Sequence, residues 1–171
     1  MLHNAGMRMR MGALAIVCFL FALPAAAAAQ TVTIKLMSIT TVTNQHDTPP
    51  KGKGNKGDSI DFKDLLTNRV PQFGKTAGKP VGFDAGTVRY TSDIDQRILV
   101  TATFPGVGTL TYEGSLTTRT NGDIVLPITG GTGGFKGARG TVTIGDGEAR
   151  VPNTYRVTVP GTLSIYGPGV A

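Results

Sequence analysis

The chain has 171 residues and a formal net charge of +6, with one cysteine, two histidines and no tryptophan. A single cysteine excludes an internal disulfide and a cysteine-based metal cluster, and His3 and His46 are too few for a histidine metal site. Basic residues are spread along the chain except in "KGKGNKG", so nucleic-acid binding is not expected.

Residues 1–29 are typical of a secretory signal peptide. Arg8 and Arg10 precede the apolar segment "GALAIVCFLFAL", and "PAAAAAQ" contains an A-x-A cleavage pattern. The apolar run is too short to span a bilayer comfortably, and no second run follows it. We therefore expect cleavage before Gln30 or Thr31. The expected product is one domain over residues 30–171, secreted to the extracellular space or the periplasm and not associated with a membrane.

The apolar residues of the mature chain recur with period two, which is typical of strands. The first predicted strand changes the phase of this alternation near Met37, which suggests a β-bulge. Eight strands are predicted, over residues 31–44, 59–67, 80–90, 97–104, 108–118, 123–129, 138–145 and 154–166. Such a set predicts an all-β fold, an eight-stranded antiparallel β-barrel, because closure removes exposed strand edges. A barrel of this size can enclose one small ligand.

The segment "ITGGTGGFKGARGTVTI", residues 128–144, contains the spacing G-x-x-G-x-x-G and raises the question of phosphate binding. A dinucleotide-binding loop needs a helix after its glycines, whereas "ARGTVTIG" is typical of a strand. A P-loop is also excluded, because neither Ser nor Thr follows Lys136. The glycines therefore predict a hairpin turn, in which Arg139 is expected to bond carbonyl groups or a carboxylate.

The same segment resembles the V-x-GGTG-x-F-x-x-ARG signature of dirigent proteins and the TGGSG-x-F-x-G segment of allene oxide cyclases. Upstream, "GTLTYEGSL" and "VGFDAG" are similar to dirigent motifs, and "GDSIDFKDLL" is similar to a cyclase strand. The four motifs agree in order and spacing across about residues 45–144. The resemblance implies an allene-oxide-cyclase-like barrel, commonly trimeric, that needs no cofactor. It also implies a hydrophobic small molecule in the interior, whose cyclisation or radical coupling the barrel steers. The signal peptide and compact length look more like a bacterial secreted relative than a plant enzyme.

The resemblance gives two candidate catalytic carboxylates. Asp47 resembles the Asp of the dirigent H-D pair, and Pro49 resembles the proline of a cyclase Ser-Pro pair that contacts ligand. At the mouth of an apolar cavity, a carboxylate with a raised pKa could exchange protons with a substrate. Alternatively, Asp47 is a solvated turn residue that caps its own backbone. Asp64 occupies the position of a cyclase Asn that holds a cavity water, or it is an outward charge beside Lys63.

Strand alternation adds candidate ligand-binding residues. If Asp64 faces inward, Phe62 faces inward with it. On the next strand Asp84, Val88 and Tyr90 share one face, and Val88 stands where the cyclases have a cavity cysteine. The phenol of Tyr90 could reach a ligand from this face.

Tyr112, on residues 108–118, is the last ligand-binding candidate. It is predicted to face inward, with a subunit contact as the alternative.

Two classes of function remain open. One is a cyclase or steering protein in which a carboxylate and a tyrosine act on a bound apolar substrate. The other is a non-catalytic secreted module for binding or interaction, which is favoured because the strand-1 Glu of the cyclases has no counterpart and Phe83 replaces a dirigent Arg. A small-molecule function requires an interior cavity of about 300 Å³.

Overall fold

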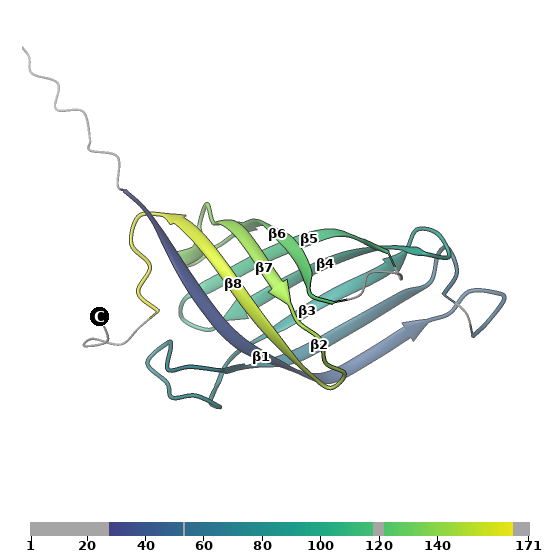
Figure 1. The fold of residues 1–171 in the computed structure, drawn as a ribbon, viewed down its shortest axis with the longest axis horizontal. Helices are drawn as coiled ribbons and strands as arrows, with labels where there is room; N and C mark the ends of the chain where they lie inside the picture. The colour runs from purple at the N-terminus through teal and green to yellow at the C-terminus, as the bar shows by residue number, and fades with distance from the viewer. Residues whose placement is uncertain (1–27, 53, 118–121, 166–171) are drawn as a thin grey trace, which may run out of the picture.

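The computed structural model describes residues 28–52, 54–117 and 122–165. Their strands form one closed antiparallel barrel, in which each strand pairs with its neighbours in the sequence and β8 pairs with β1 (Figure 1). The strands are β1 (Ala29–His46), β2 (Ser59–Asn68), β3 (Pro80–Tyr90), β4 (Asp95–Phe104), β5 (Gly108–Thr117), β6 (Ile124–Gly131), β7 (Arg139–Ile144) and β8 (Arg150–Pro160). The predicted eight-stranded barrel is confirmed.

The predicted signal peptide lies outside the described residues, except for its last two positions. Within the described ranges, no helix is long and apolar enough to cross a membrane.

The bulge in β1 is not at the predicted position. The pairing register of β1 with β2 shifts between Thr40 and Val42, and the alternation of buried and exposed residues stays regular through Met37. The change of phase in the sequence has another cause: Ser38 is polar but buried, with 3% of its surface exposed. Its hydroxyl donates a hydrogen bond to Asp64 on the neighbouring strand β2. The sequence pattern therefore marks the start of a polar zone inside the barrel.

Strand β8 also differs from the predicted strand over residues 154–166, because it ends at Pro160. It begins at Arg150 and not at residue 154, because the segment before Thr154 continues the pairing with β1 despite its proline and asparagine. Prolines are tolerated in strands where they face a position without a ladder hydrogen bond.

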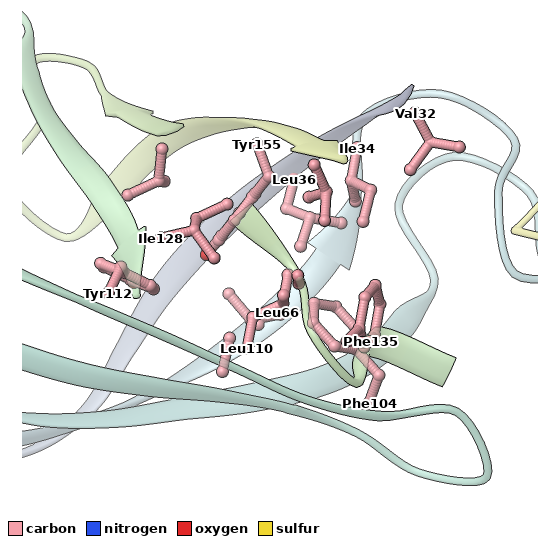
Figure 2. Close-up of a cluster of buried hydrophobic side chains, with 14 of the residues drawn as sticks. Val32, Ile34, Leu36, Leu66, Phe104, Leu110, Tyr112, Ile128, Phe135 and Tyr155 are labelled. Carbon is pink, nitrogen blue, oxygen red and sulfur yellow. The ribbon is translucent and has the colours of Figure 1, made fainter. Parts of the chain in front are cut away.

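One end of the barrel is closed by aromatic packing. The rings of Phe73 and Phe104 stack at 5.1 Å, and Phe104 meets Phe135 at 5.3 Å. Figure 2 shows Phe104 and Phe135 together within the buried cluster, with Tyr112 farther along it. Leu163 and Ile165 after β8 are also buried in this core. The interior is therefore filled at this end, where the connections 69–79, 105–107 and 132–138 lie.

The glycine-rich segment forms the connection between β6 and β7 at this closed end. A short 3₁₀ turn, Gly133–Phe135, inserts the Phe135 ring into the core. Arg139 donates hydrogen bonds from its Nη1 to the carbonyl oxygens of Thr129 and Ala138. The segment is thus a hairpin between two strands, with its arginine bonded to carbonyl groups as the sequence predicts.

The opposite end carries the connection between β1 and β2, residues 47–58, which lies at the right of Figure 1. Asp58 organises this loop by accepting hydrogen bonds from the backbone and hydroxyl of Thr48 and from the backbone of Asn55. These bonds hold the pKa of Asp58 below its ordinary value. Backbone bonds from Gly57 and to Asp58 then tie the loop to Tyr90 at the end of β3.

Candidate functional site

A cavity of about 110 Å³ lies in the barrel interior, away from the packed rings of Phe73, Phe104 and Phe135. Five polar side chains line it, and five apolar ones complete the wall. The polar residues are Ser38, Asp64, Asp84, Tyr112 and Asn153, and the apolar ones are Phe62, Ile98, Val100, Ile144 and Val151. Because Phe62, Ile98, Ile144 and Val151 stand near strand ends that meet the loops 47–58, 91–94 and 145–149, the cavity belongs to the end opposite the glycine-rich hairpin.

Two carboxyl groups meet in this cavity because of the register between β2 and β3. Asp64 is directly opposite Asp84 in the ladder, and both side chains face inward. Directly opposite residues of like charge repel one another, and Asp84 keeps only 2% of its surface exposed. Such a pair has no structural advantage over an apolar pair at the same positions. Two facing acids in a barrel core therefore point to a function.

Each acid has one hydrogen-bonded oxygen and one free oxygen. Ser38 donates to Oδ2 of Asp64 at 2.8 Å, and the Tyr112 hydroxyl donates to Oδ2 of Asp84 at 3.4 Å. The buried Oδ1 atoms of Asp64, Asp84 and Asn153 have no hydrogen-bond partner. Buried polar atoms are nearly always satisfied in folded proteins, so this group of free acceptors marks a place for an additional molecule.

Burial shifts the protonation of the site. The pKa of Asp84 is raised to about 7, mainly by burial and also by the charge of Asp64, while the hydrogen bond from Tyr112 opposes the shift. Burial also raises the pKa of Tyr112 well above its ordinary value of 10.0, so this phenol stays protonated. Asp84 therefore exchanges its proton near neutral pH, the range in which a general acid or base is most effective.

Tyr155 lies behind Tyr112, with the two rings edge to face at 5.8 Å. It is fully buried, and burial raises the pKa of its hydroxyl. The nearby polar groups of Tyr112 and Asn153 oppose this rise in pKa. The Tyr155 hydroxyl itself has no hydrogen-bond partner of normal geometry. It adds a second protonated phenol to the deep side of the site.

The structure brings four of the predicted site residues to the cavity wall: Phe62, Asp64, Asp84 and Tyr112. Asp64 therefore faces inward, not outward beside Lys63, whose ammonium group lies over the Phe83 ring. Tyr112 has 1% of its surface exposed, so it is an interior residue and not a surface contact of this chain.

The other four predicted residues lie outside the lining. Val88 packs against the core, and Tyr90, at the end of β3, packs against Gly54 of the loop 47–58. Asp47 is in that loop, where its Oδ2 accepts the backbone N–H of Gly52. This contact matches the alternative of a backbone-capping turn residue. Pro49 is exposed in the same loop. The structure thus does not bring the expected carboxylate of Asp47 to the interior, because its own loop holds it.

Two lining residues, Ser38 and Asn153, are not among the site residues predicted from the sequence. Ser38 has a recognisable signal, since it is a polar residue at an inward position of an otherwise apolar strand face. Asn153 has none, because "VPNT" is typical of a turn and the inward position follows only from the pairing of β8 with β1.

The interior cavity of about 300 Å³ that a small-molecule function is expected to require is not present in the described residues. The cavity at Asp64 and Asp84 has a volume of about 110 Å³, which is below the roughly 300 Å³ typical of sites that enclose a whole ligand. At about 30 Å³ for each water molecule, it holds a few waters or one end of a larger molecule. Among the described residues, no group of three or more His, Cys, Asp or Glu side chains could hold a metal ion.

Several solved structures of known proteins have a fold similar to this barrel. A pyocyanin demethylase superposes with a TM-score of 0.61 and 25% sequence identity, over 74% of this chain and 99% of that chain. Two pterocarpan synthase dirigent proteins superpose with TM-scores of 0.60 and 0.56. The first is 19% identical in sequence, and the match covers 80% of this chain and 89% of the dirigent chain. The second is 18% identical, and the match covers 83% of this chain and 98% of the dirigent chain.

No protein-family model and no curated protein sequence matches the chain. The two dirigent structures support the fold, and the demethylase adds similarity in sequence. Together with the closed eight-stranded barrel, these structures show that the chain shares its fold with the dirigent proteins and the pyocyanin demethylase.

Proposed function

We propose that the protein binds one end of a hydrophobic small molecule in the cavity and uses Asp84 and Asp64 to move a proton on it. The observation that carries the proposal is the set of buried, unpartnered oxygens of Asp64, Asp84 and Asn153, which all face one cavity. The apolar wall and the surrounding strand ends provide contact for the rest of the ligand, which extends out of a cavity too small to enclose it.

The proposed chemistry needs no cofactor. Near pH 7 Asp84 is present in both protonation states, so it can donate a proton to one ligand atom and later accept one from another. A cyclisation or an isomerisation has this balance, because the proton given at one atom is recovered at a second. The known structures support a reaction on a small organic molecule, since their names are those of a pyocyanin demethylase and of pterocarpan synthases.

A second candidate is a non-catalytic binding protein. It is supported by the small cavity volume and by the absence of a counterpart to the cyclase glutamate in β1. In this case the acids orient a ligand and do not react with it.

The test begins with the native ligand. Protein purified from its own host is analysed by native mass spectrometry, and the released metabolite is incubated with the protein and with Asp84→Asn and Asp64→Asn. We expect each variant to lose at least about 100-fold in turnover while binding changes much less, because an amide cannot exchange a proton.

The matched control is Asp61→Asn, which changes a carboxylate on the outer side of the same strand. It should keep the activity of the unmodified protein. Binding without turnover in every form would support the second candidate, and unchanged turnover in Asp84→Asn would refute the proton-transfer role.

We also propose that the protein is exported and forms a homotrimer, from the pattern of residues 1–29 and the resemblance to trimeric barrels. N-terminal sequencing of the protein recovered outside the cytoplasm should give Gln30 or Thr31 as the first residue. Retention of residues 1–29 would contradict export by cleavage. The mass in solution, measured by light scattering, checks the trimer.

A further inference from the structure

We infer that the cavity takes the cationic end of its ligand, a primary or secondary ammonium group carried by an apolar body. The inference rests on the proposed binding function and names the chemical class of ligand. Its basis is the charge of the wall: Asp64 and Asp84 line the cavity, and none of the described lining residues is a lysine, arginine or histidine. The ion pairs His46–Asp61 and Arg97–Glu113 involve exposed side chains and do not reach the site.

The hydrogen-bonding capacity left in the site points the same way. The donors Ser38 and Tyr112 already bind the Oδ2 atoms of Asp64 and Asp84. When both acids are ionised, what remains free among the lining residues is accepting capacity, on Oδ1 of each acid and on Oδ1 of Asn153. The unpartnered hydroxyl of Tyr155 is not part of the lining. Asp84 and Asn153 are 2% and 3% exposed, so water outside the barrel does not satisfy them. A primary ammonium group has three N–H donors and no acceptor, which complements three free acceptors.

The size and polarity of the cavity fit a head group on an apolar body. About 110 Å³ accommodates an ammonium group and its first carbon atoms. Phe62, Ile98 and Ile144 then contact the apolar body toward the mouth. An anionic end, such as a carboxylate, would face two acids without a compensating cation and is disfavoured by like-charge repulsion.

A buried acid normally requires an opposite charge or a proton. When no ligand is bound, a proton on Asp84 meets this requirement; the titratable groups that face it, among the residues described, are Asp64, Tyr112 and Tyr155. An ammonium group would replace that proton, because a nearby positive charge favours the ionised carboxylate. Binding of the cation near neutral pH should therefore release a proton to the solvent.

The experiment compares three probes with the same apolar body: 2-phenylethylamine, 2-phenylethanol and phenylacetate. Their binding to the full-length mature protein is measured by NMR titration, with the backbone amides of Asp64, Asp84 and Val100 as reporters of the cavity. We expect the amine to bind at least about 10-fold more tightly than the alcohol, since charge-assisted hydrogen bonds are the stronger ones. Phenylacetate should cause no saturable shift.

Variants provide the second arm. Asp64→Asn should weaken binding of the amine about 10-fold and change binding of the alcohol less than about 2-fold, because only the amine uses the negative charge. Asp61→Asn, on the outer face of β2, should leave both unchanged. The ranking of the three probes on the unmodified protein decides the inference even if a cavity variant does not fold.

Equal binding of all three probes, or tighter binding of phenylacetate, would overturn the inference and leave the proposed small-molecule site in place. A complete lack of shifts at the reporter amides, together with no metabolite in the native mass spectrum, would remove both the inference and the proposed function.

Discussion

Gly140→Ala is expected to destabilise the barrel by about 4 kcal/mol or more, a large part of the 5–15 kcal/mol typical of folded domains. Gly140 has φ +136°, a conformation that residues with a side chain rarely adopt. A Cβ atom at this position would overlap the carbonyl oxygen of Arg156 on β8. This oxygen belongs to the backbone of a paired strand, so it cannot move away without opening the ladder between β7 and β8.

The glycine-rich segment itself offers the matched control. Gly130 has no heavy atom within 4 Å of its Cβ position, so Gly130→Ala should change stability by less than about 1 kcal/mol. Urea denaturation followed by circular dichroism measures both variants. Equal stability of the two would contradict a role for Gly140 in close strand contact.

Asp84→Asn is expected to remove most of the pH dependence of stability between about pH 4 and pH 8. The pKa of Asp84 rises from an ordinary 3.8 in the unfolded chain to about 7 in the folded barrel. Between these two pKa values the folded protein binds a proton that the unfolded chain has lost. Stability is therefore highest below about pH 4, falls as the pH rises toward 7, and levels off above it. At about 1.4 kcal/mol for each unit of pKa, the loss is at most about 4 kcal/mol.

Urea denaturation at pH 5 and pH 8 tests this prediction. The unmodified protein should be less stable at pH 8 than at pH 5 by about 3 kcal/mol, because about two pH units separate pH 5 from the pKa of Asp84. Asp84→Asn should show little difference, because an amide does not ionise. Asp61→Asn should keep the slope of the unmodified protein. The same slope in Asp84→Asn would show that Asp84 does not ionise in this range.

The two ends of the barrel interior differ in polarity. Phe73, Phe104 and Phe135 pack together in the interior at one end. Toward the other end, Asp64 and Asp84 occupy buried positions where an apolar core would have apolar side chains. The raised pKa of Asp84 means that the folded protein is less stable above neutral pH. Loss of stability at a site of unsatisfied polar groups is common where binding or catalysis requires those groups.

The sequence by itself determined the class of fold and one face of each strand. Period-two alternation predicts strands, the glycines after Ile128 predict a hairpin, and an inward Asp64 implies an inward Phe62. For Asp84 and Tyr112 the same alternation identified residues that do line the cavity. These properties follow from local geometry, which depends on a few neighbouring residues.

Only the tertiary structure decided which inward residues meet. Asp64 faces Asp84 because of the register between β2 and β3, and Ser38 and Asn153 join them through the pairing around the closed barrel. A shift of register would change every such contact without changing the local pattern. Asp47 is held in the loop 47–58, where its carboxylate accepts a hydrogen bond from the backbone N–H of Gly52. The site therefore depends on long-range pairing and on the closure of the sheet, and these are properties of the whole chain and not of any one segment.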